Sequence, residues 1–132
     1  MALLFSEYYF YLVAYNMALN ADGALRTEHE YPAYYRVDRI RFYRQLEEHF
    51  AIPYPQRFET GEFRKRVQFM YGGKLRKIRF KYTGASVEAI LDRLPTAKIV
   101  EKKGDGYIIT AEVFGDGVDM WIRSQGENVK LL

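Results

Sequence analysis

The chain has 132 residues, of which 48% are hydrophobic and 17% aromatic, so it can build a hydrophobic core and is too apolar to remain disordered. It contains no cysteine, which excludes disulfide bonds, a thiolate nucleophile and every cysteine-based metal site. The net charge of +3 is unevenly spread, because residues 57–81 hold nine basic and two acidic side chains whereas residues 1–35 hold one basic and four acidic ones. A basic stretch of this kind either attracts an anion or forms the solvated face of a helix and a strand.

The first predicted element lies in the apolar stretch at residues 1–15. This stretch differs from a signal peptide, because it lacks a basic start, carries Glu7 and has no small-residue cleavage site. Residues 8–15 are aromatic and β-branched, which predicts a strand buried on both faces. No stretch reaches the roughly 18 uncharged apolar residues that a membrane span requires, so we expect a soluble, cytoplasmic protein.

Two further signals precede a predicted boundary in the middle of the chain. Residues 20–23, Asn-Ala-Asp-Gly, have the composition of a turn, and residues 33–43 form a second extended run. We expect this run to pair antiparallel with the first strand. Residues 52–60 are rich in turn formers, and Pro53 and Pro55 preclude a regular helix, so the boundary between two segments is placed there.

Helices and strands alternate in the second segment. Thr60 is expected to cap a helix that carries Phe63, Val67 and Met70 on one face and ends near residues 72 and 73. Residues 103–106 predict a hairpin turn, and Gly126 suits the end of a helix. The remaining pattern reads strand, helix, strand, strand, helix, strand, the βαββαβ order of a ferredoxin-like unit, over residues 75–82, 86–94, 97–102, 107–113, 118–125 and 128–132.

Two short stretches resemble the signature strands of the WYL domain. They are residues 10–15, Phe-Tyr-Leu-Val-Ala-Tyr, with Phe10 in the place of the family's Trp, and residues 36–40, Arg-Val-Asp-Arg-Ile. The βαββαβ segment, with Trp121 in its last helix, resembles the WCX extension that follows many WYL domains. The resemblance covers essentially the whole chain and points to a bacterial helix-turn-helix transcriptional regulator of the DeoR-like or YafY-like kind.

The resemblance implies an α+β protein in which a partial Sm-like or SH3-like β-barrel precedes a ferredoxin-like βαββαβ unit. Residues 1–55 would be the partial WYL sensor domain, residues 56–73 a linker helix and residues 74–132 the WCX domain. The chain starts at what would be a middle strand of the barrel, without the family's first strands and its helix-turn-helix. We therefore expect a fragment or a truncated product.

The ligand-binding residues implied by the resemblance are Tyr11, which matches the central Tyr of the first motif, and Arg36 and Arg39, which match the two arginines of the second. Reported ligands of the family are nucleotides and single-stranded nucleic acid. The chemistry agrees, because a guanidinium holds phosphate bidentately and an aromatic face stacks on a base. On a flat strand Arg36 and Arg39 point to opposite faces, so a shared site requires a bulge or must wrap an edge.

Structural roles for these side chains remain open at this stage. Asp38 can form an ion pair with either arginine, and Tyr11 can be a core aromatic. His29 and His49 are far apart in sequence and make a poor metal site, so no metal is expected. Further candidates for anion binding are five basic side chains: His29, Arg41, Arg64, Lys65 and Arg66.

The sequence offers no catalytic machinery. An acylphosphatase-like site would need an arginine in the turn at residues 82–86, which has none. Serine nucleophile motifs, a glycine-rich phosphate loop and paired carboxylates are also missing. We therefore expect no enzyme activity and no cofactor.

The expected partners are a nucleotide or short nucleic acid effector, DNA through the helix-turn-helix that precedes the domain in the family, and a second copy of the chain. A homodimer is expected because a barrel that lacks strands leaves unpaired strand edges. The alternative is a purely structural assembly module without a ligand. Ile108, Phe114 and the C-terminal strand would then form its contact surface.

Overall fold

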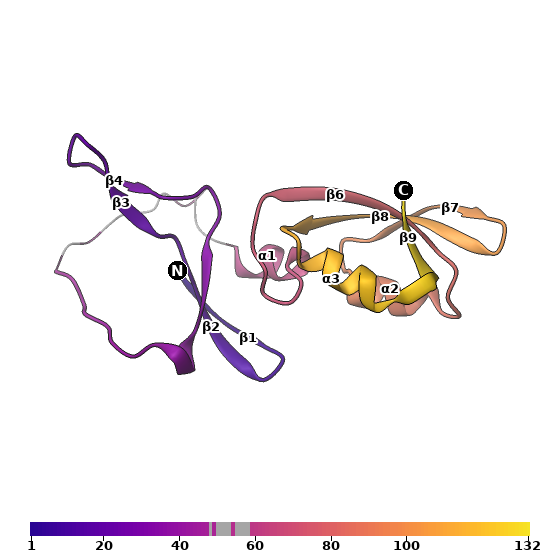
Figure 1. The fold of residues 1–132 in the computed structure, drawn as a ribbon, viewed down its shortest axis with the longest axis horizontal. Helices are drawn as coiled ribbons and strands as arrows, with labels where there is room; N and C mark the ends of the chain where they lie inside the picture. The colour runs from indigo at the N-terminus through magenta and orange to yellow at the C-terminus, as the bar shows by residue number, and fades with distance from the viewer. Residues whose placement is uncertain (48, 50–53, 55–58) are drawn as a thin grey trace. The chain divides into compact units, whose positions relative to one another are not determined.

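The computed structural model describes residues 1–47, 49, 54 and 59–132, and it divides into two compact units, Met1–Thr60 and Gly61–Leu132. The protein is mixed α+β, and its described residues form antiparallel sheets and three α-helices (Figure 1). The boundary predicted from Pro53 and Pro55 concerns residues that lie outside the described ones. No helix in the described part of the chain is long and apolar enough to cross a membrane.

The first unit contains antiparallel strands only, in two groups. A three-stranded sheet has the order β1-β2-β5, and a separate hairpin pairs β3 with β4. A single 3-10 turn, η1 (Val37–Arg39), follows β5. The described strands of this unit form no closed barrel; they are β1 (Ala2–Ser6), β2 (Tyr9–Ala14), β3 (Met17–Leu19), β4 (Leu25–Thr27) and β5 (Ala33–Arg36).

The pairing predicted between the two extended runs is confirmed, because β2 and β5 are antiparallel neighbours with Tyr11 opposite Arg36. The turn at residues 20–23 is also present, and Gly23 there has φ 77°. Two details of the prediction are wrong. Residues 8–15 are not a strand buried on both faces, because only Val13 of β2 is buried and the described residues before Thr60 contain no α-helix to cover the sheet. The run at residues 33–43 stays extended in the sheet only as far as Arg36, where η1 begins.

The second unit is a four-stranded antiparallel sheet with the order β7-β8-β6-β9. Its strands and helices follow the predicted order strand, helix, strand, strand, helix, strand from residue 75 onward. The predicted bounds agree with the structure to within one or two residues. The elements are α1 (Thr60–Arg66), β6 (Leu75–Tyr82), α2 (Val87–Arg93), β7 (Lys98–Lys103), β8 (Gly106–Phe114), α3 (Gly117–Ser124), η3 (Gly126–Asn128) and β9 (Val129–Leu131).

One face of this sheet forms the core. Alternate residues of a strand point to opposite faces, and in β6 the buried set is Ile78, Phe80 and Tyr82. Helices α2 and α3 pack on that face, where the ring of Trp121 meets that of Phe80 edge-on at 6.1 Å between centroids. Burying an aliphatic or aromatic side chain of this size contributes about 1.5–3 kcal/mol. The helices therefore cover one face of the sheet, and most of the charged residues of β6 lie on the other face together with Ile108 and Phe114 of β8.

Helix α1 ends earlier than the sequence predicts. It stops at Arg66 rather than near residues 72 and 73, and Val67 forms a parallel bridge with Phe114 instead of another helical turn. The backbone takes left-handed φ angles of 53° and 55° at Phe69 and Met70, which are incompatible with a continuing helix. The segment is also closely packed, since a Cβ on Gly117 would lie only 2.1 Å from the carbonyl oxygen of Gln68. The ring of Phe63 stacks on that of Phe114, with 5.5 Å between the ring centroids, and this contact packs α1 beside the end of β8.

Candidate functional site

The structure brings two of the three predicted ligand-binding residues together. Tyr11 in β2 and Arg36 in β5 are direct cross-strand partners, and both are half-buried. Directly opposite residues in an antiparallel pair have Cβ atoms about 4.5–5.5 Å apart and share a face of the sheet. The phenol and the guanidinium thus lie next to each other on one face.

Arg36 already has two partners on this face. Its Nε donates to Asp38 Oδ1 at 3.1 Å and its Nη2 donates to Asp38 Oδ2 at 2.6 Å. Its Cζ also lies 3.4 Å from the centroid of the Tyr9 ring, a cation–π contact. The hydrogen bond to Asp38 raises the pKa of Arg36, and the same bond lowers the pKa of Asp38. The ion pair considered from the sequence is therefore present, and it fixes the orientation of the guanidinium.

Arg39 lies after strand β5 and not on it. The flat-strand argument does not apply, because residues 37–39 form a 3-10 turn, closed by the Ile40 amide donating to the Val37 carbonyl at 3.2 Å. Arg36 precedes this turn as its N-cap in an extended conformation, with φ −65° and ψ 122°. Arg39 is exposed, and its charge contributes to lowering the pKa of Asp38. Asp38 thus interacts with both arginines, and the group retains one excess positive charge.

Among the described residues, no hydrogen bond, ion pair or ring contact joins the other two candidates of the first unit to this group. His29 lies exposed between β4 and β5, where its ring stacks on that of Tyr31 at 5.6 Å. Arg41 is exposed in the extended segment after η1. Both are exposed side chains, and the described residues form no defined site around either of them.

The candidates on α1 face acidic side chains. Lys65 and Arg66 both bond Glu62, at 2.7 and 2.8 Å, and Arg66 reaches Glu112 on β8 at 3.5 Å. The bond from Arg66, followed by that from Lys65, lowers the pKa of Glu62 to about 2. Arg64 is exposed on the same helix. Helix α1 is therefore less basic than its sequence suggests, because Glu62 and Glu112 offset the charges of Lys65 and Arg66.

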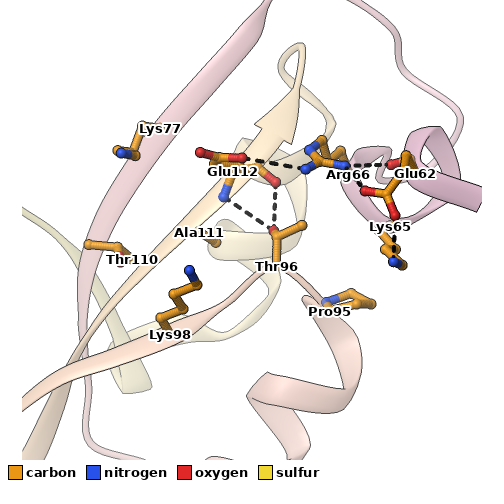
Figure 2. A pocket seen from close by; sticks show the side chains of 10 residues that line it. All are labelled: Glu62, Lys65, Arg66, Lys77, Pro95, Thr96, Lys98, Thr110, Ala111 and Glu112. Atoms are coloured by element: carbon orange, nitrogen blue, oxygen red, sulfur yellow. Dashed lines mark hydrogen bonds and ion pairs between the residues drawn. The ribbon is translucent and has the colours of Figure 1, made fainter.

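A pocket lies beside α1 on the side of the sheet opposite to α2 and α3. It has a volume of about 320 Å³ and is lined by polar and charged side chains from α1, β6, β7 and β8. Figure 2 shows Lys77, Thr110 and Lys98 along one side of the pocket and the linked Glu62, Arg66 and Glu112 along the other. The Thr96 hydroxyl donates to the Glu112 carbonyl oxygen at 2.6 Å and accepts from the Glu112 amide at 3.2 Å. These two hydrogen bonds tie the residues just before β7 to β8.

Three residues of these sites were missed by the sequence reasoning. Tyr9 shares a strand face with Tyr11 two residues further on, so alternation could have indicated it. Lys77 belongs to an alternation of charged and apolar residues along β6 that is also visible in the sequence. Lys98 lies on the same face of the sheet as Lys77 only because β7 pairs with β8 in this register, and no local sequence signal specifies that pairing.

Comparison with known proteins gives no family assignment: no protein-family model matches the chain, and no curated protein matches it. The resemblance to the WYL domain therefore rests on the two quoted motifs and on the order of elements. Within the described residues no group of three or more His, Asp or Glu side chains is placed to hold a metal ion.

Proposed function

We propose that this chain is the ligand-sensing and dimerisation region of a bacterial transcriptional regulator, made of part of a WYL domain followed by a WCX extension. The strand order β9-β6-β8-β7 with α2 and α3 on one face supports a ferredoxin-like second domain. The open sheet β1-β2-β5 is compatible with part of an Sm-like barrel. A cytoplasmic location and binding to DNA through a helix-turn-helix belong to the same proposal.

The observation that supports the sensing role is the register of β2 and β5, which sets Tyr11 opposite Arg36, with Arg39 three residues further along the chain at the end of η1. Arg36 is held by Asp38 and Tyr9, so it orients the site, whereas the exposed Arg39 is the group that would contact an incoming phosphate. Tyr11 would stack on a base. The effector is accordingly a nucleotide or a short single strand, whose phosphate and base match these two kinds of group.

The first test replaces Arg39 with Ala and measures the binding of a fluorescent nucleoside triphosphate by anisotropy. Affinity should fall by about 1.5–3 kcal/mol, the usual value of a hydrogen bond to a charged group, which is roughly 10- to 150-fold. Arg39→Lys should not restore it fully, because an ammonium lacks the planar fork. Arg26→Ala removes an exposed arginine from β4 and serves as the matched control. Unchanged binding in Arg39→Ala would reject this site.

A second candidate function, a structural assembly module, is favoured by an apolar face in the first unit. Leu3, Phe5 and Phe10 share one face of the sheet β1-β2-β5 and are 62%, 48% and 54% exposed. The surface expected from the sequence is different, and part of it is wrong: Ile108 is only 3% exposed, and Phe114 is stacked on Phe63. An assembly surface would therefore lie on the first sheet. The two functions are compatible, since Tyr11 and Arg36 occupy the opposite face.

A further inference from the structure

The face of the second sheet that α2 and α3 leave open carries a row of cations. Lys77, Arg79 and Lys81 alternate with the buried residues of β6, and the strand pairings add two more lysines at the same face. Lys98 of β7 lies opposite Thr110, whose other partner is Arg79, and Lys130 of β9 lies opposite Lys81. Strand alternation therefore gathers five cations from three strands on one side of the sheet.

Carboxylates on this face compensate only part of that charge. Lys81 bonds Asp105 at 2.9 Å, and Arg79 lies 3.9 Å from Glu101. Glu112, the carboxylate opposite Lys77, is turned toward Arg66. Among the residues that the structure describes, three lysines of the face have no carboxylate within ion-pair distance: Lys77, Lys98 and Lys130.

The pocket beside α1 concentrates this unbalanced charge at one place. Lys77 and Lys98 both line it, with the Thr110 hydroxyl between their strands, as Figure 2 shows. Two ammonium groups and a hydroxyl are donors to anionic oxygen atoms. Arg79 and Lys81 continue from the pocket along β6, at intervals of about 6.6 Å for alternate residues, and Lys130 lies beside Lys81 on β9. That interval is on the scale of successive phosphates in an extended nucleic-acid strand.

We propose that the open face of the sheet β7-β8-β6-β9 binds the phosphate backbone of a single-stranded nucleic acid, with Lys77 and Lys98 as its central contacts. A single row of cations along one strand matches a single chain of phosphates. Phe114, the aromatic side chain that β8 presents on this face, is stacked on Phe63, so stacking on bases contributes little and no base preference is expected. This surface goes beyond the effector site and stands independently of it, because Tyr11, Arg36 and Arg39 all belong to the other unit.

The test uses a fluorescein-labelled oligothymidylate and the double variant Lys77→Gln/Lys98→Gln of the full chain. Anisotropy titrations should show affinity falling about tenfold. The slope of log K against log salt should become shallower by about 1.4, since each lost phosphate contact on a single strand contributes about 0.7. The matched control is Lys102→Gln/Arg123→Gln, which removes the same charge elsewhere in the unit: Lys102 faces the Tyr107 ring and Arg123 lies on α3. It should bind like the parent.

Trp121 emission, from the core on the helix side of the sheet, checks that each variant is folded. Equal affinity of the two double variants for oligothymidylate would overturn the proposal. It would also be overturned if the parent bound a poly-glutamate peptide of the same charge, or a duplex of the same length, more tightly than it binds oligothymidylate. Because Arg39 belongs to the effector site proposed for the first unit, the Lys77→Gln/Lys98→Gln change is also made in an Arg39→Ala background, where it should lower the affinity for oligothymidylate by the same factor as in the parent. Loss of binding in Arg39→Ala, with none in Lys77→Gln/Lys98→Gln, would place the strand on the first unit and reject the open face.

Discussion

Gly115 and Gly104 have the same left-handed backbone conformation but meet different surroundings. Their φ angles are 64° and 62°, a region that costs other L-residues about 1–2 kcal/mol. A Cβ on Gly115 would lie 2.1 Å from the Gly72 carbonyl oxygen, whereas a Cβ on Gly104 would meet nothing within 4 Å. Gly115 thus allows the segment after α1 to pass against the turn between β8 and α3.

The two glycines make a matched pair for a stability measurement. Gly104→Ala should lower the free energy of unfolding by about 1 kcal/mol, the conformational cost alone. Gly115→Ala should lower it by about 3 kcal/mol or more, because the backbone must also move. Urea unfolding followed by the fluorescence of Trp121, the only tryptophan of the chain, reports on the second unit. Equal losses in the two variants would show that the close approach to Gly72 does not matter.

At the scale of elements, helix α1 contains one carboxylate, that of Glu62, which forms ion pairs with two cations, Lys65 and Arg66. Because the pKa of Glu62 lies at about 2 instead of 4.5, its ion pairs stabilise the folded state above pH 4.5 and this contribution is lost as the pH falls toward 2. Removing Arg66, the main cause of the shift, should therefore return the pKa toward its ordinary value.

An NMR titration of the Glu62 carboxyl checks this expectation. The parent should titrate near pH 2, and Arg66→Gln should titrate at a distinctly higher pH. Arg123→Gln on α3 changes the net charge equally and should leave the midpoint unchanged. A parent midpoint at the ordinary glutamate value would mean that the pair with Arg66 is not formed in solution.

The elements of the second unit could be predicted from the sequence because their local signals agree. Period-two alternation marks β6, helical spacing marks α2 and α3, and glycines mark the turns at residues 104 and 126. The first unit gave weaker signals. Its β1–β2 turn places Glu7 at φ 57° without a glycine, and β5 gives way to η1 where Asp38 binds Arg36. No local sequence pattern predicts the positive φ of Glu7 or the end of strand β5 at Arg36.

The candidate sites could be predicted only in part. Tyr11 and Arg36 were expected on adjacent strands, and the structure pairs them. The open face of the second sheet was not predicted, since β7 carries a register shift between Ile99 and Glu101 that decides which of its residues share a face with Lys77. Such registers depend on packing between strands and not on local sequence.

At the scale of the whole molecule, the two units distribute polar and apolar surface differently. The second sheet covers one face with helices and presents cations on the other. The first sheet has an exposed apolar face, where the rings of Phe5 and Phe10 lie 5.1 Å apart. Within the part of the chain that the structure describes, its edge strands β1 and β5 each pair with one strand. Apolar faces and open edges of this kind favour association with another chain.

We therefore expect the chain to form a homodimer through the apolar face of the first sheet. Sedimentation equilibrium at micromolar concentration should give twice the 15.6 kDa of the chain. Phe10→Ser removes a central ring of this face and should shift the equilibrium toward monomer, because each buried aromatic side chain contributes about 1.5–3 kcal/mol. Tyr8→Ser is the control, since Tyr8 is 85% exposed but lies in the turn between β1 and β2 and should leave the dimer intact. A parent that sediments at 15.6 kDa would rule out this dimer, and equal dissociation in both variants would place the interface elsewhere.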